Sequence, residues 1–270
     1  MSRSISVAEL RRCLTQARGM LGPLVLIHSS LKRIGYLEEG PGMLVGELLR
    51  VLGPDGTLVA PYFTDIDASV RDRWRQEVRA NTGRLAEVLA AHPDAQISDH
   101  PTHAVVAVGR AASAITAGHA EHGAFGLASP LDRFAERDGR ILLCGVGHVA
   151  NSMIHIGETH AGRPKGQLVD VDAARQPASS VQVTPDASAS CSAAFGSIEH
   201  PLRVRGEIRD WRIGEALCQV VAARSVIETT TNLIRGNPTE LLCSFPGCTR
   251  CGFTRHALAG FDRPRSGDGA

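Results

Sequence analysis

The stretch PLVLIHSSLKRIGYLEEGPGMLVGELLRVLGPDGTLVAPYFT, residues 23–64, decides the fold class. Its first part, PLVLIHSS (23–30), is an apolar run that ends in polar residues, which indicates a buried strand. PGMLVGELLRVL (41–52) has a helical pattern, with a proline near its start and a Gly-Pro pair after its end. GTLVAPYFT (56–64) is a second strand. Strand, helix and strand within about forty residues form a βαβ unit, which predicts an α/β layered fold.

Further elements follow on both sides of this unit. MSRSISVAELRRCLTQARG, at the start, predicts an amphipathic helix with one apolar side. GRLAEVLAAHP (83–93) predicts another helix, AVVAVG (104–109) a strand, and RILLCGVG (140–147) gives the strongest strand pattern in the chain. We also expect two peripheral antiparallel strands within 165–190, a long helix over 211–234, and a surface helix or lid in the arginine-rich segment 67–80.

Composition limits the classes of function. Of the 270 residues 43% are hydrophobic, which is enough for a sizeable core, and the net charge of +1 gives no electrostatic reason to expect nucleic acid as a partner. No signal sequence and no run long enough to span a membrane is present, so we expect a cytoplasmic protein without a membrane partner. We predict one domain over residues 1–257, including a cysteine-rich segment at 243–251, and a disordered tail over 258–270.

One histidine and one glutamate stand directly beyond the RILLCGVG strand. In NSMIHIGE (151–158), Asn151 or Ser152 can cap a helix, and the i, i+3 spacing puts His155 and Glu158 on one face. A carboxylate fixes the tautomer of a neighbouring imidazole and stabilises its protonated form, which makes the ring a better general base. Open α/β sheets build their sites at strand carboxyl ends, so a catalytic pair is favoured over a surface ion pair here.

Two further polar motifs lie at strand junctions. The hydroxyls and amides of HSSL (28–31) can hold phosphate, although the chain has no glycine-rich phosphate loop. DHPTH (99–103) offers His100 and His103 as metal ligands, but a zinc site normally needs three or four ligands. We therefore interpret these histidines as part of a polar active-site wall.

Six of the seven cysteines fall into two groups. Cys13, Cys144 and Cys218 stand in apolar contexts, where a free thiol packs as a small hydrophobic group. Cys243, Cys248 and Cys251 crowd one short segment, LLCSFPGCTRCGF. Without a secretory signal such crowding favours metal binding over disulfides, with three reduced thiols as the alternative.

Five blocks in order carry a resemblance to a known family. LIHSSLKRIGY, GPDGTLVAPYFT, HPTHAVVAVG, SPLDRFAERDGRILLCGVG and NSMIHIGE together resemble the aminoglycoside 3-N-acetyltransferases, the antibiotic acetyltransferases outside the GNAT fold. The resemblance runs from about residue 26 to residue 158 and continues more weakly through AFGSIEHPLRVRGEIRDWRIGEALCQVV. It implies a three-layer α/β/α sandwich around a mixed, mostly parallel sheet. It also implies transfer of an acetyl or related acyl group from acyl-coenzyme A to an amine.

The resemblance also assigns roles by position. The residues that would contact acetyl-CoA are Ser29, Ser30, Leu31, Lys32 and Ser152, and His100 and His103 would lie near the reacting centre. His155 would take the proton from the attacking amine, and Glu158 would orient His155 or bind the ammonium group. We expect direct transfer in a ternary complex. Cys144, on the strand leading to the site, is the one conceivable nucleophile.

A zinc ligand set follows partly from the same resemblance. Some relatives with a similar tail carry a cysteine at the position of Cys191, which makes it the fourth ligand beside Cys243, Cys248 and Cys251. His256 is the competing fourth ligand. Four thiolates leave no open coordination position, so such a zinc ion would be structural.

The segment 65–82 departs from what a polycationic acceptor requires. It is rich in arginine, whereas a site for an aminoglycoside should be lined with carboxylates. The acceptor is therefore either aminoglycoside-like or a biosynthetic amine, and Arg71 and Arg73 could instead bind the 3′-phosphate of the cofactor. A metal-binding or sensing protein on an acyltransferase scaffold is the alternative function, and a metal-dependent hydrolase using His100, His103 and His155 is a third. The sequence leaves a homodimer open.

Overall fold

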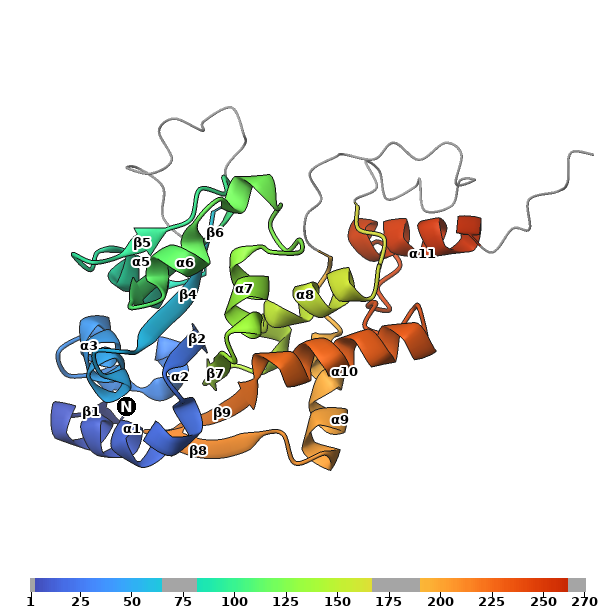
Figure 1. Cartoon of the computed structure of the whole chain (residues 1–270). Helices are drawn as coiled ribbons and strands as arrows, with labels where there is room; N and C mark the ends of the chain where they lie inside the picture. The colour runs from blue at the N-terminus through green and yellow to red at the C-terminus, as the bar shows by residue number, and fades with distance from the viewer. Residues whose placement is uncertain (1–2, 65–81, 167–189, 262–270) are drawn as a thin grey trace, which may run out of the picture.

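The sheet at the centre of the molecule has seven strands in the residues that the computed structural model describes, 3–64, 82–166 and 190–261. Their order is β5-β6-β4-β2-β7-β9-β8 (Figure 1). The bounds of these strands are β2 Leu24–Ser29, β4 Thr57–Phe63, β5 Gln96–Ile97, β6 His103–Gly109, β7 Arg140–Cys144, β8 Arg209–Ile213 and β9 Ala216–Ala222. A separate parallel pair joins β1 (Ser4–Ile5) to β3 (Tyr36–Leu37).

The predicted βαβ unit forms the middle of this sheet. β2 and β4 are parallel and are connected through α3 (Pro41–Leu52), and β7 runs parallel to β2 on its other side. The other four described pairs, β4–β6, β5–β6, β7–β9 and β8–β9, are antiparallel. The sheet is mixed, as expected, but the expectation that it is mostly parallel is wrong. The reason is that β6 and β9 are entered from the edge at which β4 and β7 end, so no crossover makes them parallel.

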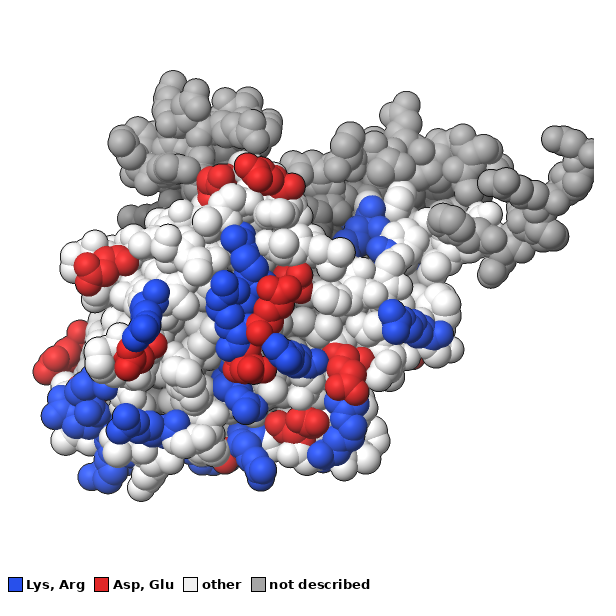
Figure 2. All heavy atoms as spheres, viewed as in Figure 1, with Lys and Arg blue, Asp and Glu red and all other residues white. Residues whose placement is uncertain are grey.

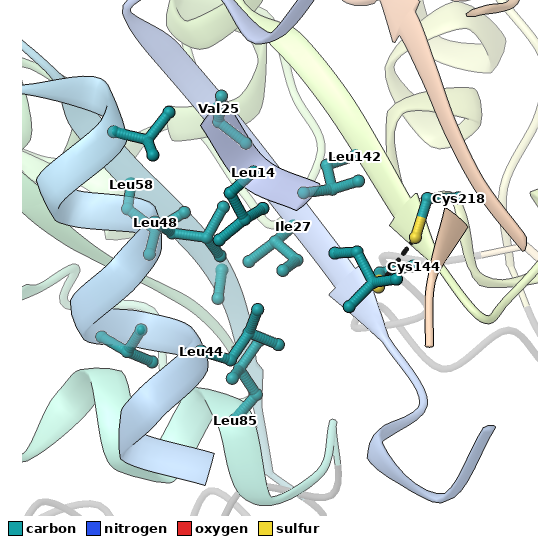
Figure 3. Packing of buried hydrophobic residues seen from close by; sticks show 14 of the residues in the cluster. Leu14, Val25, Ile27, Leu44, Leu48, Leu58, Leu85, Leu142, Cys144 and Cys218 are labelled. Carbon is teal, nitrogen blue, oxygen red and sulfur yellow. Dashed lines mark hydrogen bonds between the residues drawn. The ribbon is translucent and has the colours of Figure 1, made fainter. Parts of the chain in front are cut away.

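Helices cover both faces of the sheet. Successive side chains of a strand point to opposite faces, so Val25 and Ile27 enter one core while Leu24 and Leu26 enter the other. Residues of α1, α3 and α5 complete the first core, part of which Figure 3 shows, and residues of α6, α7, α8 and α10 complete the second. This is the three-layer arrangement (Figure 1). The remaining helices are α1 Val7–Leu21, α2 Leu31–Ile34, α5 Arg84–Ala90, α6 Ala112–Thr116, α7 Pro130–Glu136, α8 Met153–His160, α9 Glu199–Val204, α10 Ala223–Gly236 and α11 Thr249–Phe261.

The first helix shows how the local sequence determines an element. The side chain of Ser6 accepts a hydrogen bond from the backbone N–H of Glu9 at 3.2 Å and so caps α1. Leu10, Leu14 and Ala17 are fully buried along one face, as the amphipathic pattern predicts.

The long helix predicted over 211–234 is wrong in its first half. The chain forms the β8–β9 hairpin there, and only then α10. Gly214 turns the hairpin with φ +56°, and a Cβ atom at this position would lie 2.5 Å from the carbonyl oxygen of Ile34. The residues of β9 pair with β7 in the interior of the sheet, so burial overrides the helix that apolar spacing alone predicts.

Three sequence predictions fall partly or wholly outside the described residues. The arginine-rich segment at 67–80, including Arg71 and Arg73, is one of them, and the two peripheral strands expected within 165–190 are another. The third is the tail over 258–270, of which the structure describes only the first residues, as the end of α11 at Phe261. The single domain over 1–257 stays a prediction.

Charge is mixed over the surface that Figure 2 shows, where Lys and Arg lie beside Asp and Glu over much of the face. Arg203 and Asp210 form one of the described ion pairs, with 2.8 Å between Nη1 and Oδ2. None of the described helices combines the length and the apolar character that crossing a membrane requires.

Replacing Gly157 by alanine should destabilise the protein. Gly157 lies where α8 packs against α10, and an added Cβ atom would lie 2.4 Å from the Cβ atom of Thr230. Such overpacking typically costs about 1–3 kcal/mol. Gly46→Ala in α3 is the matched control, because nothing lies within 4 Å of its added Cβ atom, and alanine there should leave stability unchanged or raise it by up to about 1 kcal/mol. Urea unfolding of both variants measures the difference, and equal effects would contradict this packing.

Candidate active site

A cavity of about 1110 Å³ lies at the carboxyl ends of the central strands. β2 contributes His28 and Ser29 to its wall, and β4 contributes Phe63. β6 is antiparallel to β4 and pairs His103 with Phe63, so the start of β6 reaches the same edge. α8 and the turn before it supply Asn151, Ser152 and His155. The position of this cavity follows the general rule for open α/β sheets.

His155 and Glu158 form the hydrogen-bonded pair that their spacing predicts. Nδ1 of His155 lies 2.9 Å from Oε2 of Glu158, and both residues are buried. The side-chain oxygen of Asn151 accepts the backbone N–H of Met153 at 3.1 Å, so Asn151 is the residue that caps α8. Because a carboxylate only accepts hydrogen bonds, Nδ1 carries the proton in this pair and Nε2 keeps its lone pair.

The carboxylate of Glu158 is held from both sides. Nη1 of Arg163 donates to Oε1 at 3.1 Å, and both side chains are fully buried. The hydroxyl of Ser190 donates to Oε2. Burial raises the pKa of Glu158, but the hydrogen bonds from His155 and Ser190 and the positive charge of Lys165 outweigh it, so the net pKa is lowered. Glu158 is therefore ionised at neutral pH.

The ring of His155 is neutral at neutral pH. It packs between two aromatic rings, with centroid distances of 4.6 Å to Phe125 and 4.9 Å to Phe195. Burial lowers the pKa of His155, and this effect exceeds the opposing effect of Glu158. A neutral imidazole with a free Nε2 is the form that can accept a proton.

Lys165 stabilises α8 through two hydrogen bonds to residues of this helix. Its ammonium group donates to the carbonyl oxygen of His155 at 2.9 Å and to Oγ1 of Thr159 at 2.5 Å. Burial lowers the pKa of Lys165 to about 8, against the raising effect of Glu158. Lys165 thus fixes the backbone that carries His155.

The two histidines of DHPTH differ in their positions. His103 lines the cavity, packs against Phe63 at 4.9 Å, and has a pKa lowered to about 3 by burial and by the charge of His100. His100 is not among the described residues that line the cavity, and its ring centroid lies 5.7 Å from that of His103. Instead its Nδ1 accepts the backbone N–H groups of Thr102 at 3.3 Å and His103 at 3.1 Å. His100 holds the turn that presents His103.

The expected cofactor residues are divided in the same way. Ser29 and Ser152 line the cavity, and so does His28, which is not among the expected cofactor residues. Ser30, Leu31 and Lys32 are not among the described lining residues. Ser30 precedes α2, its backbone N–H donates to the carbonyl oxygen of Cys144 at 2.9 Å, and Lys32 is exposed.

Cys144 does not act as a nucleophile in this fold. It is fully buried in the first core, with its Sγ 3.1 Å from Sγ of Cys218 (Figure 3), and it is not among the described lining residues. The hydrogen bond with Cys218 and burial raise its pKa well above the usual value. The thiolate needed for attack on a thioester is therefore suppressed.

Four cysteines from two segments of the chain come together beside the cavity. The Sγ atoms of Cys191, Cys243, Cys248 and Cys251 all lie within 4.8 Å of one another. A tetrahedral zinc ion with Zn–S bonds of about 2.3 Å needs sulfur atoms about 3.8 Å apart, so the cluster fits one ion after small shifts. Backbone N–H groups donate to Sγ of Cys251 at 3.3 Å and Sγ of Cys191 at 3.5 Å, which suits thiolates.

Three residues that hydrogen-bond to His155 or Glu158 could not be identified from the sequence. Arg163 follows Glu158 by five positions, which is not a helical spacing, and it reaches back only because the chain turns at Gly162, φ +72°. Lys165 follows in the same turn. Ser190 stands in a stretch of small polar residues, and only the fold brings it to α8.

Comparisons with known proteins point to one family. The family model described as aminoglycoside 3-N-acetyltransferase matches residues 26–235. The chain is 29% identical to aminoglycoside N(3)-acetyltransferase IV from Salmonella sp over 217 residues, which cover 80% of this chain and 82% of that protein. It is 35% identical to aminoglycoside N(3)-acetyltransferase VII from Streptomyces paromomycinus over 170 residues, covering 56% and 59% of the two chains.

Solved structures agree with this assignment. The apoenzyme of aminoglycoside acetyltransferase AAC(3)-IVa superposes with a TM-score of 0.78 at 27% identity, over 94% of this chain and 98% of that one. AAC-IIIb in binary complex with CoASH has the same fold, with a TM-score of 0.69 at 23% identity over 87% and 97% of the chains. The chain therefore belongs to the aminoglycoside 3-N-acetyltransferase family, a family of N-acetyltransferases.

Proposed function

We propose that the protein transfers an acetyl group from acetyl-CoA to an amine of an aminoglycoside-like or biosynthetic acceptor, with His155 as the general base. The observation that carries this proposal is the hydrogen bond from Nδ1 of His155 to buried Glu158, on a ring that borders the cavity. The family supports the reaction type. A histidine-to-alanine mutant of AAC(3)-IVa in complex with a gentamicin, which superposes with a TM-score of 0.77 at 27% identity, supports an aminoglycoside-like acceptor.

The chemistry follows from the protonation states. The amine nitrogen attacks the thioester carbonyl while Nε2 of His155 takes a proton from that nitrogen. Ionised Glu158 stabilises the imidazolium that forms, as a carboxylate does for a catalytic histidine. The C–S bond then breaks, and the imidazolium can return its proton to the departing thiolate of coenzyme A. Every proton thus moves through one ring.

Both substrates must reach this ring through the cavity. We propose that Ser29 and Ser152, which line it, contact acetyl-CoA. We also propose, from the family resemblance of the HSSL block, that Ser30, Leu31 and Lys32 continue this contact toward the pyrophosphate. His103, held neutral, completes the wall beside His155 and can donate or accept a hydrogen bond there. Direct transfer in a ternary complex needs no covalent intermediate, in keeping with the buried position of Cys144.

We further propose that Cys191, Cys243, Cys248 and Cys251 bind a structural zinc ion. The convergence of four Sγ atoms supports this, and three of these cysteines also line the cavity. The alternative function, that of a metal-binding or sensing protein, would require the four cysteines but would not require binding of the acetyl-CoA thioester. Calorimetry against acetyl-CoA separates the two, because a sensor need not bind acetyl-CoA.

His155→Ala should lower turnover by about 10²–10⁴-fold, because a general base contributes that much. Acetylation of a gentamicin or of apramycin, followed by thiol release from acetyl-CoA, measures this, and calorimetry should show unchanged affinity for coenzyme A. The control is His160→Ala on the same helix, whose Nε2 lies 2.8 Å from Asp132 and which does not line the cavity. Retained turnover in His155→Ala would rule out the assigned base.

The pH profile should show a limb on its acid side with a midpoint below pH 6.5. Burial lowers the pKa of His155 from 6.5, so the active neutral form persists as the pH falls and is lost only below that value. Glu158→Gln should move the limb to still lower pH, since the charge that raises this pKa is gone. The profile should be measured with two acceptors whose amines differ in pKa. A midpoint that is the same for both belongs to a group of the enzyme, whereas a midpoint that moves with the acceptor belongs to the acceptor amine. A midpoint above 6.5 would contradict the burial of this ring.

Purified protein should contain about one zinc ion per chain by elemental mass spectrometry, as four clustered thiolates require. Cys191→Ser should lose most of it, and the thermal unfolding midpoint should fall because the ion joins distant segments. Cys13→Ser is the control, since Cys13 lies on α1 and packs against the first core. Metal-free wild-type protein from zinc-supplemented cells would reject the site.

A further inference from the structure

Ser190 touches both members of the catalytic pair. Its hydroxyl donates to Oε2 of Glu158, and its Oγ lies 3.1 Å from Nδ1 of His155. The residue is buried. The carboxylate oxygen that accepts from the imidazole therefore has a second donor, and that donor limits where the carboxylate can turn. Loss of the hydroxyl would leave the buried Oε2 atom one hydrogen bond short.

The backbone of Ser190 belongs to no helix or strand. It precedes the short 3-10 helix η6 (Phe195–Ile198), in irregular backbone, and the residue before it lies outside the described part of the chain. The next residue is Cys191, whose Sγ belongs to the four-cysteine cluster. A bond at Cys191 Sγ would thus restrain the backbone of its neighbour, Ser190.

The other side of Glu158 leads to the same cluster. Arg163, which donates to Oε1 of Glu158, also donates to the carbonyl oxygens of Pro238, at 3.0 Å, and Glu240. These two residues lie just before Cys243 in the chain. Ser190 on Oε2 and Arg163 on Oε1 therefore connect the carboxylate to both segments that carry the cysteines. An ion that closes the cluster would fix the two segments relative to each other.

We propose that Ser190 is a positioning residue, and that metal bound by the four cysteines acts on the transfer reaction by holding Ser190 against Glu158 and His155. This inference rests on the proposed general base and on the proposed metal site. The metal contributes no chemistry to the step itself. Its effect reaches the reaction only through the orientation of His155, so it should change kcat and leave the affinity for acetyl-CoA unchanged.

The decisive experiment combines one variant with metal removal. Ser190→Ala should lower kcat by about 10–100-fold, the equivalent of a hydrogen bond to a charged group, with KM for acetyl-CoA within about twofold. Ser190→Thr keeps the hydroxyl and should restore most of the loss. Ser197→Ala is the control, because Ser197 is exposed nearby and only bonds the carbonyl oxygen of Ala194.

Chelation of the holoenzyme supplies the second arm. Removing zinc from the wild type should lower kcat by the same factor as Ser190→Ala, and removing it from Ser190→Ala should lower kcat little further, since the two changes remove one interaction. Hydrogen exchange supplies a readout that does not depend on activity. Backbone amides of residues 190–198 should exchange faster after chelation in both proteins, but not in metal-loaded Ser190→Ala.

Each part of the inference can fail separately. Normal kcat in Ser190→Ala overturns the positioning role, even when His155→Ala is inactive and the proposed function stands. If chelation lowers kcat by the same factor in wild type and in Ser190→Ala, the metal does not act through Ser190, and the proposed coupling between them is overturned. An active His155→Ala variant overturns the general base itself. If Ser190→Ala does not fold, the kcat of Ser190→Cys, which has a weaker donor, takes its place with the same expected direction.

Discussion

A single buried carboxylate organises the site. Glu158 has no exposed surface, and a charge in that position would protonate or turn away unless donors surrounded it. Arg163 occupies one oxygen, and His155 and Ser190 share the other. Breaking such a buried pair by deleting one partner costs about 3–5 kcal/mol, because the remaining charge is left uncompensated. The orientation and tautomer of His155 follow from this arrangement.

The parallel pairing of β2 with β7 and the packing of α8 bring these groups to one edge of the sheet. β7 runs parallel to β2 in the middle of the sheet, so the chain leaves it at the edge where β2 presents His28 and Ser29. α8 begins there and carries His155 and Glu158 back across the second core. Gly157 permits α8 to approach α10 closely, and Thr231 of α10 donates to the carbonyl oxygen of Gly157 at 3.2 Å. The residue that allows close packing, Gly157, thus lies on the same turn of α8 as His155 and Glu158.

Much of this could be predicted because it is local. The βαβ unit follows from apolar runs and a Gly-Pro stop, and the pair at 155 and 158 follows from helical spacing beyond a strand end. The convergence of the four cysteines needed the family resemblance to bring in Cys191, and the fold agrees with that choice.

What could not be predicted depends on contacts between distant segments. The β8–β9 hairpin has apolar spacing that suits a helix equally well, and only its pairing with β7 decides. His100 and His103 are alike in sequence, yet one faces the cavity and the other holds a turn. Ser190 and Arg163 reach Glu158 across gaps of 32 and 5 residues, and neither gap has a local pattern.

The protonation state of His155 is the most direct measure of this account. Nitrogen-15 NMR of labelled protein at pH 7 reports which ring nitrogen carries the proton. The hydrogen bond to Glu158 predicts a neutral ring with its proton on Nδ1 and none on Nε2, and this signal should disappear in His155→Ala. A ring protonated on Nε2 alone, or a fully charged imidazolium, would contradict a general base at this position.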